Sequence, residues 1–307
     1  MSREAPRKVL FLTGHGEPEV REGAAAPDQL KSIQFVLNDL KDVNTPVEAV
    51  SLFGKDAKTP DPSEVAALVI IGPERELADE EARRVNEYLN KGGHVLLALN
   101  TRGPSFSKFL APWGIKTGDD IVLDRTQEGL VVVQADQSSP EAVRMARRVI
   151  FQPLRSVTGA TPAPGGVTVT ELLKSGPNSE VVANYVPGKP VDLRASKPGP
   201  IAIAAMAEKK LGTGDDAKTA RLVVLGDSMF MADQFARIPA FYNRDLASGL
   251  INYLAQEEAL VTIAPKDENT EQAFLLPEQG RLLTLIHLAD FPLLALLLAV
   301  VVYLKRR

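Results

Sequence analysis

Cysteine is absent from the 307 residues of this chain, and histidine and tryptophan are scarce. Without cysteine the chain has no thiol nucleophile, no disulfide and no cysteine-ligated metal. The three histidines, His15, His94 and His287, lie far apart, and none has the H-x-x-x-H spacing typical of a metal site. We therefore expect no metal centre and no cofactor, while enzymes that use serine, aspartate or lysine remain open.

A basic excess is also missing. Lysine and arginine number 35 against 39 aspartate and glutamate residues, and the net charge is −4. This balance argues against a nucleic-acid-binding protein. A chain of this length, 45% hydrophobic, can bury the core of one large α/β domain or two smaller ones.

The C-terminus, in contrast, carries a long hydrophobic run. Residues 291–304 are apolar, and extending the run back to Leu282 provides the about 20 residues that a membrane-spanning helix needs. A buried core helix and an amphipathic surface helix are the alternatives, but the run is terminal and has no polar face. We predict a transmembrane helix over 282–304, preceded by a linker over 267–281.

The basic tail, residues 305–307, is expected on the cytoplasmic side by the positive-inside rule, which leaves the globular part extracytoplasmic, in a periplasm or its equivalent. Residues 1–20 show no signal peptide. Either the domain is cytoplasmic and the tail crosses, or an upstream membrane helix precedes this sequence. We expect the second, because Met1 stands only a few residues before the first predicted strand.

The first part of the chain alternates strand and helix patterns, which predicts a doubly wound α/β domain with a mostly parallel sheet. Continuous apolar runs indicate strands buried on both faces, and apolar residues at helical spacing indicate amphipathic helices. The expected strands are 8–14, 45–53, 67–73 and 94–100, and the expected helices are 28–42, 77–93 and 106–114.

Short β-like pieces separated by proline- and glycine-rich segments follow, which predicts a β-rich inserted lobe. Strands at 199–208 and 221–227 and a helix at 243–258 are then expected to rejoin the first sheet. The predicted organisation is a first part of the α/β domain (1–118), the lobe (119–200), the return to the α/β domain (201–266), the linker (267–281), the membrane helix (282–304) and the tail (305–307).

The loop after the first strand is one candidate site. Gly14 and Gly16 would let a ligand approach the backbone, with His15 and Glu17 as polar groups, and ligands of open α/β sheets bind at the carboxyl ends of strands. The loop is not a dinucleotide fingerprint, because Glu19 stands where the third glycine would be. The alternative is a tight turn that needs glycine, with His15 and Glu17 as local caps.

A second candidate follows the strand at 221–227. Gly226-Asp227-Ser228 is similar to the G-D-S of certain serine esterases, but only His287 follows it, so Ser228 would need His15 or another upstream histidine as its base. The alternative is that Asp227 or Ser228 caps the next helix. We assign no catalytic residue. The tentative ligand-binding crevice comprises Gly14, His15, Gly16, Glu17, Asp227 and Ser228.

Several stretches together resemble the GldG family, auxiliary components of ABC-type transport systems first associated with gliding motility. The stretches that carry this resemblance are 8–17, 68–99, 109–124, 171–180, 221–230 and 243–266, with the terminal hydrophobic segment. The resemblance implies an extracytoplasmic domain related to the class I glutamine amidotransferase-like fold, held beside an ABC permease and ATPase. That fold uses a cysteine nucleophile, and this chain has none, so the amidotransferase activity does not carry over.

The leading prediction is a non-enzymatic, membrane-anchored accessory subunit of an ABC-type transport or gliding-motility complex. Its extracytoplasmic domain would bind partner subunits or an envelope substrate. One alternative is an envelope hydrolase or small-ligand-binding enzyme that uses His15, Glu17 and Asp227, which requires these groups to converge within hydrogen-bond reach. Another is a sugar- or peptide-binding module that acts without a transporter.

Overall fold

The computed structural model describes residues 6–20, 32–133, 139–184, 196–214, 217–256 and 304–306. The chain divides into two units, Met1–Val261 and Thr262–Arg307, and the elements below belong to the first. The predicted membrane helix at 282–304 lies outside the described residues except for Leu304, as does the predicted linker. In the part of the chain that is described, no helix is both long and apolar enough to cross a membrane.

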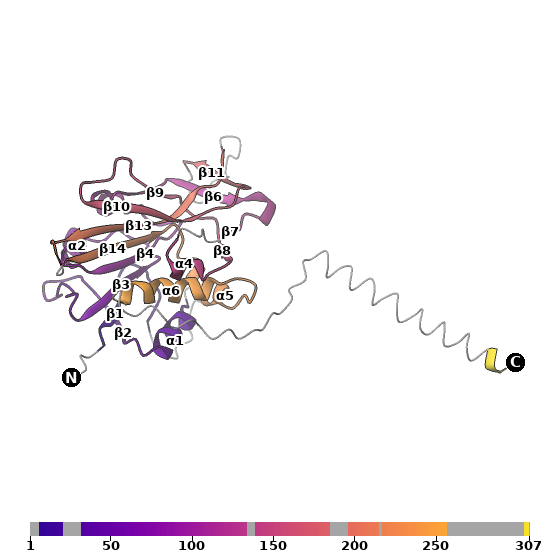
Figure 1. The fold of residues 1–307 in the computed structure, drawn as a ribbon, viewed down its shortest axis with the longest axis horizontal. Helices are drawn as coiled ribbons and strands as arrows, with labels where there is room; N and C mark the ends of the chain where they lie inside the picture. Colours follow the sequence, from indigo (N-terminus) through magenta and orange to yellow (C-terminus); the bar gives the residue numbers. More distant parts are fainter. Residues whose placement is uncertain are drawn as a thin grey trace. The chain divides into compact units, whose positions relative to one another are not determined.

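A seven-stranded sheet forms the centre of the first unit. In spatial order its strands are β10 (Val167–Lys174), β13 (Ala202–Leu211), β14 (Lys218–Leu225), β4 (His94–Ala98), β3 (Val65–Ile71), β1 (Lys8–Leu12) and β2 (Val47–Val50), from top to bottom in Figure 1. The pairs from β14 to β2 are all parallel, whereas β13 is antiparallel to both its neighbours. The sheet is mostly parallel, which confirms the predicted α/β class.

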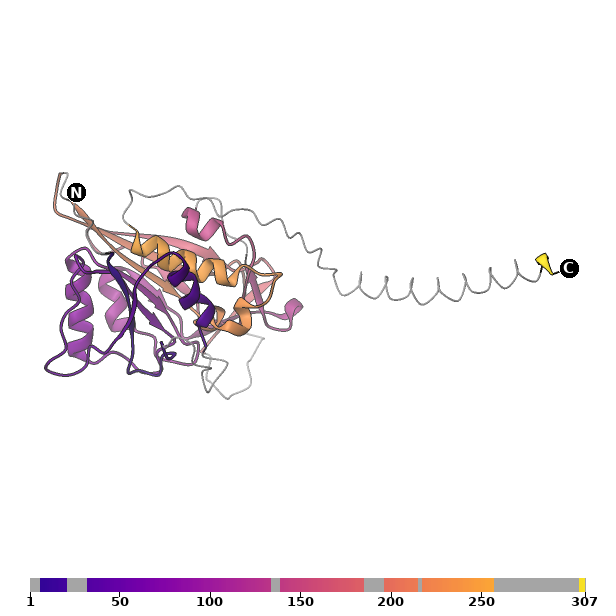
Figure 2. The same ribbon diagram turned by 90° about the horizontal axis from the view of Figure 1, so that it is seen from below.

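Helices cover both faces of this sheet, as the prediction of a doubly wound fold requires. Alternate strand residues point to opposite faces. One face packs against α1 (Gln34–Asp42) and α6 (Asn243–Ala255), which lie side by side in Figure 2 in indigo and orange. The other face packs against α2 (Asp79–Asn90) and α3 (Ser107–Leu110). Both faces are therefore dry. Every residue of β3 and β4 is buried, and all of them except His94 at the start of β4 are apolar.

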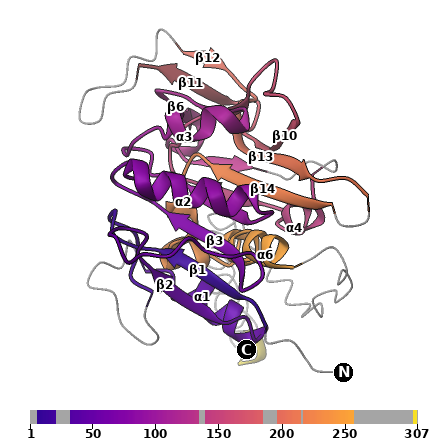
Figure 3. The same ribbon diagram turned by 90° about the vertical axis from the view of Figure 1, so that its left-hand side faces the viewer.

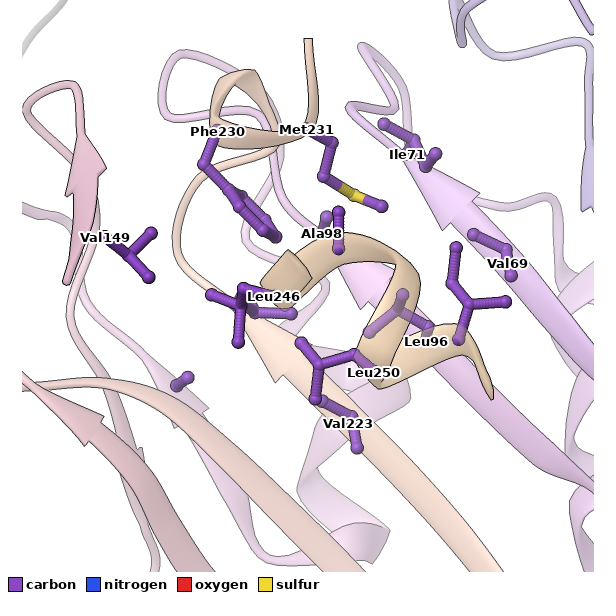
Figure 4. Close-up of a cluster of buried hydrophobic side chains, with 14 of the residues drawn as sticks. Val69, Ile71, Leu96, Ala98, Val149, Val223, Phe230, Met231, Leu246 and Leu250 are labelled. Atoms are coloured by element: carbon purple, nitrogen blue, oxygen red, sulfur yellow. The ribbon is translucent and has the colours of Figure 1, made fainter. Parts of the chain in front are cut away.

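The core beneath α6 is shown in Figure 4. Leu246 and Leu250 point from α6 toward the sheet side chains Leu96 and Val223, and all four are fully or almost fully buried. Removing a leucine side chain of this size from water stabilises the fold by roughly 1.5–3 kcal/mol. The helix is therefore held mainly by its apolar face.

Smaller sheets form most of the predicted lobe, and β6 and β11 lie beyond the β10 edge of the central sheet (Figures 1 and 3). Their strands are β5 (Ile115–Thr117), β6 (Asp120–Asp124), β7 (Val131–Val133), β8 (Val149–Phe151), β9 (Val157–Gly159), β11 (Ser179–Ala183) and β12 (Lys197–Pro198). They pair as β12-β11-β6, β5-β9 and β7-β8. Although β10 belongs to the predicted lobe range 119–200, it pairs with β13 in the central sheet. The lobe boundaries stay predictions.

Short helical turns connect these elements. They are η2 (Ala111–Trp113), η3 (Arg125–Gln127), α4 (Glu141–Arg144), η5 (Met229–Met231) and α5 (Asp233–Ala236). The helix predicted over 106–114 is thus α3 followed by η2, and Gly114 ends it at a φ of 66°. Only glycine adopts such a φ without strain, so the backbone turns there into β5.

Helix α1 begins at Gln34, later than the predicted start at residue 28, and residues 28–31 lie outside the described part. No side chain at its own N-terminus caps it. Instead Asp233 accepts the Phe35 backbone N–H at 2.9 Å and the hydroxyl of Ser32. A carboxylate from far along the sequence therefore stabilises the start of this helix.

Candidate functional site

The loop after β1 turns His15 inward, between two carboxylates. Its Nδ1 lies 3.1 Å from Oε1 of Glu17, and its Nε2 lies 2.9 Å from Oε2 of Glu81 in the first turn of α2. The three side chains are at most 8% exposed. A carboxylate only accepts, so both contacts are hydrogen bonds when both ring nitrogens carry protons. His15, Glu17 and Glu81 form the group that we name the histidine clamp.

The clamp also organises the backbone around it. Glu17 accepts the His15 backbone N–H at 2.6 Å, and Glu81 accepts the Ala78 N–H at 3.0 Å at the start of α2. The backbone carbonyl of His15 accepts the N–H of Glu74 at 2.7 Å. The clamp therefore ties the β1 loop to α2 and to the loop after β3.

Gly14 and Gly16 have φ values of 119° and 97°, which L-residues rarely adopt. A Cβ at Gly16 would lie 2.8 Å from the side chain of Glu74. The close approach that requires glycine is thus to the protein itself. This geometry supports the alternative of a tight turn with local caps, and a ligand role for the two glycines stays a prediction.

Asp227, just after the end of β14, is only 1% exposed. Its carboxylate accepts hydrogen bonds from the backbone N–H groups of Met229 at 2.9 Å and Phe230 at 3.1 Å. Its carboxylate therefore caps η5, as the structural alternative for this motif expected. The hydroxyl of Ser228 lies against Gly72, where an added Cβ would come within 2.7 Å of it. Asp227 thus holds the turn after β14, and Ser228 packs close to the end of β3.

The six residues of the predicted crevice fall into two groups at one edge of the sheet. Two strands, β4 and β3, lie between β14 and β1, so the strand ends that carry Asp227 and His15 are about 14 Å apart. Both ring nitrogens of His15 face glutamates, which leaves neither for Ser228. This arrangement does not favour the hydrolase alternative, which requires His15, Glu17 and Asp227 to converge.

Arg155 was not singled out from the sequence, yet it reaches the same edge. Its Nε donates to the carbonyl of Thr101 at 3.0 Å, and its Nη2 donates to that of Gly103 at 2.5 Å. The third nitrogen, Nη1, is buried without a hydrogen-bond partner among the described residues. Burial lowers the pKa of the Arg155 guanidinium below its ordinary value. The nearby negative charges of Asp119 and Asp120 act in the opposite direction and offset this effect only in part. A lone arginine after a β-like piece offers no sequence signal for this position.

Burial raises the pKa of Asp227 to about 7, although the N–H groups of Met229 and Phe230 favour the ionised form. The folded-state pKa lies above the ordinary value of 3.8, so the folded state binds this proton more tightly than the unfolded state between the two values. The stabilising contribution of the protonated carboxyl is complete below about pH 4 and is lost as the pH rises through about 7.

Asp227→Asn removes this titration. Relative to the unmodified protein, we expect the free energy of unfolding of the variant to improve by about 2 kcal/mol between about pH 5 and about pH 8. Denaturant unfolding at several pH values measures the difference. Asp61→Asn is the control, because Asp61 is exposed and hydrogen bonds from Ser63 lower its pKa, so it stays ionised throughout this range. Parallel curves for Asp227→Asn and the unmodified protein would contradict the expectation.

Among the described residues, no group of three or more histidine, aspartate or glutamate side chains is arranged to hold a metal ion. What the edge does contain is a clamp, a buried cap and an arginine that hold loops together. A ligand-binding role for Gly14, His15, Gly16, Glu17, Asp227 and Ser228 stays a prediction.

One solved structure shares the fold of this chain, and others are more distantly similar. The N-terminal domain of mmIFT52 superposes on this chain with a TM-score of 0.55 at 16% identity. The match covers 83% of this chain and 100% of that domain. A putative ThuA-like protein from Parabacteroides merdae ATCC 43184 gives a TM-score of 0.43 at 13% identity over 86% of this chain and 94% of its own. A glutamine amidotransferase from Thermotoga maritima gives a TM-score of 0.43 at 10% identity, covering 83% of this chain and 100% of its own.

The mmIFT52 domain, at this low identity, shows a common fold and nothing about function. No match was found among curated proteins. A family model described as "ABC-type uncharacterized transport system" matches residues 6–255, which include the whole central sheet and both helix layers. The chain therefore belongs to this family of auxiliary components of ABC-type transport systems.

Proposed function

We propose that this chain is a membrane-anchored accessory subunit of an ABC-type transport complex, of the GldG kind. The family match across residues 6–255 is the observation that carries this proposal. In it, the α/β domain binds partner subunits or an envelope substrate and performs no chemistry of its own. A role in gliding motility belongs to the same proposal.

The geometry of the strand ends supports a binding role over a catalytic one. General acid–base or nucleophilic catalysis needs a side chain that can reach a substrate. Here the polar groups already serve the fold, because Glu17 and Glu81 occupy both nitrogens of His15, and Asp227 is bound to backbone N–H groups. These side chains make the loops rigid, which suits a surface that recognises a partner.

The membrane anchor and the side of the membrane are proposed from the sequence. Residues 282–304 are long and apolar enough for a span, and the basic residues after them favour the cytoplasmic side. The α/β domain would then stand on the extracytoplasmic side, beside the permease, and the ATPase would act from the cytoplasm.

Co-purification tests the proposal. The full chain with a tag after Arg307 is isolated from native membranes in a mild detergent, and we expect an ABC ATPase and a permease to elute with it in fixed proportion. The same tag on an unrelated single-span protein is the control. Recovery of the chain without either subunit, in several detergents and after crosslinking, would contradict the accessory role.

The same tagged cells report the orientation. Protease added to spheroplasts is expected to remove the α/β domain and to spare the tag, since the tag lies in the cytoplasm. If protease cleaves the α/β domain only after the spheroplasts are lysed, the domain lies in the cytoplasm. That result would overturn the proposed orientation, whatever the result of the co-purification.

A further inference from the structure

Several arginines lie on the surface where α4, α5 and α6 meet, and the three helices are close together in Figure 1. Val143 and Ala146 are each 1% exposed and anchor this segment in the core, while the residues next to them face outward. The backbone N–H of Tyr242, just before α6, donates to the carbonyl of Arg148 at 2.8 Å. We name six exposed residues of this surface the arginine patch: Arg144, Met145, Arg147, Arg148, Arg237 and Tyr242.

The guanidinium groups of the patch are unpaired. Within the described part of the chain, none of its four arginine side chains forms a hydrogen bond or an ion pair. Arginines elsewhere are mostly engaged with carboxylates or backbone carbonyls; examples are Arg83, Arg84, Arg125, Arg155 and Arg244. Guanidinium groups with free donors are therefore concentrated on this surface.

Aromatic rings hold two of these arginines in place. The guanidinium carbon of Arg148 lies 5.0 Å from the centroid of the Phe241 ring, and that of Arg237 lies 5.4 Å from the centroid of Phe35. A cation–π contact of this kind orients the charge but occupies no N–H donor in a hydrogen bond. Each guanidinium therefore keeps a planar fork of donors, and this fork matches the two oxygens of a carboxylate.

The patch is positive in a chain whose net charge is −4. The acidic residues of the same helices are Glu141 at the start of α4 and Asp245 in the first turn of α6. Asp39 is neutralised, because it accepts hydrogen bonds from Arg244. Even with Glu141 and Asp245 counted, the arginines of the patch outnumber the acids. The surface therefore complements a negatively charged partner.

We propose that the arginine patch binds an acidic face of a partner subunit, whose carboxylates accept hydrogen bonds from the free guanidinium groups. The inference rests on the proposed accessory role and names the surface that performs it. Arginine, tyrosine and methionine are enriched in protein–protein interfaces, whereas lysine is depleted. The patch contains no lysine, and its Met145 and Tyr242 are 42% and 37% exposed. A membrane surface attracts lysine and arginine alike, so this composition favours a protein.

Site-specific photo-crosslinking in native membranes identifies what covers the patch. The photoreactive amino acid p-benzoylphenylalanine replaces Tyr242 in the full chain. In a parallel sample it replaces Phe53, which is 75% exposed and lies in a loop that Arg84 ties to α2, on the other face of the sheet. We expect the probe at Tyr242 to link to a subunit of the transport complex, at a peptide rich in aspartate and glutamate. The probe at Phe53 is not expected to link to that peptide.

Charge variants test whether the arginines are responsible. R144E/R147E reverses two exposed side chains that have no partner among the described residues, and we expect it to lower the yield of the Tyr242 crosslink by at least about tenfold, the loss of one charge-assisted hydrogen bond. R102E/K116E is the matched control, because it changes the net charge equally at two exposed positions outside the patch. It is expected to crosslink like the unmodified protein.

A second variant guards against a loss of folding. Arg237→Glu changes the patch at the end of α5, independently of α4, and the same loss of crosslinking is expected. Thermal unfolding of each variant shows whether the domain is folded. Replacing two acidic residues of the crosslinked peptide by lysine is expected to restore the link in R144E/R147E, which a merely structural effect of that variant would not allow.

Separate results would overturn this inference and the proposed function. If R144E/R147E, Arg237→Glu and the unmodified chain crosslink equally, the arginines do not bind the partner. A probe at Tyr242 that links only to phospholipid would make the occupant a membrane surface, and links only to a second copy of this chain would make it self-association. If the transporter subunits co-purify but never link to Tyr242, the accessory role stands and the patch is not its surface. If the subunits do not co-purify with the unmodified chain at all, both fail.

Discussion

Gly226→Ala is expected to destabilise the α/β domain by about 3 kcal/mol, the upper end of the usual cost of overpacking. A Cβ at this position would lie 2.0 Å from the carbonyl oxygen of Arg155, a backbone atom that cannot rotate away. The two backbones also share a hydrogen bond, from the Arg155 N–H to the Gly226 carbonyl at 3.2 Å. The methyl group would therefore separate β14 from the segment between β8 and β9.

Denaturant unfolding measures this effect, with Gly165→Ala as the control. No atom lies within 4 Å of the place where a Cβ at Gly165 would stand. Alanine is expected there to change stability by no more than about 1 kcal/mol. Equal stabilities for Gly226→Ala and Gly165→Ala would show that the Arg155 backbone moves freely and that this contact does not hold the lobe to the sheet.

Glu81→Ala is expected to cost about 3 kcal/mol, at the upper end of the penalty for leaving a buried hydrogen-bonding group unsatisfied. The substitution takes the acceptor from His15 Nε2 and from the Ala78 backbone N–H together. The remaining contact of His15 with Glu17 limits the loss. Because the β1 loop and the first turn of α2 are both affected, amide hydrogen exchange should quicken in these two segments first.

Glu80→Ala is the matched control, because the neighbouring Glu80 side chain is 53% exposed. It pairs with the exposed Arg83 and with one nitrogen of the buried Arg84. Arg84 keeps its hydrogen bonds to the carbonyls of Leu52 and Gly54, so the loss of Glu80 is expected to lower stability much less than the loss of Glu81. Glu81→Gln should fall between the two, since the amide oxygen keeps an acceptor for one N–H but removes the charge. If Glu81→Ala and Glu80→Ala unfold alike, the clamp contributes nothing to the fold.

The proposed accessory role and the two stability predictions are independent. Loss of the clamp would show what holds the loops at the strand ends, whereas the partners of the chain are identified only by co-purification. A variant such as Glu80→Ala that folds normally but loses its transporter subunits would locate the partner surface on the exposed side of α2. The domain would then act through its helical layer.

Much of the fold followed from local pattern. A continuous apolar run predicted β3, because a strand buried on both faces favours apolar side chains at every position. The helix predicted over 77–93 is α2, within a few residues at each end, because acidic residues in its first turn and two glycines after it mark both ends in the sequence. A tight turn at Gly14 and Gly16 was the alternative to a ligand site there, and their positive φ values support that alternative.

Partners distant in sequence could not be predicted in this way. Glu81 was identified only as a charge in the first turn of a helix, but the packing of α2 on the sheet brings it to His15, 66 residues away. Likewise β10 lies in a stretch of short β-like pieces, and only its pairing with β13 places it in the central sheet. Pairing of this kind depends on which edges remain open when the sheet assembles.

The sequence by itself determined the α/β class, the two-sided burial of the central strands and the absence of cysteine chemistry, because these depend on residue type and local spacing. Only the tertiary structure decided that the strands leading to His15 and to Asp227 lie about 14 Å apart, with β4 and β3 between them. It also gathered Arg7, His94, Lys218 and Arg221 around one cavity. Strand order sets both arrangements, because it brings strand ends that are distant in the sequence to one edge of the sheet. Strand order is a property of the assembled sheet and not of any one segment.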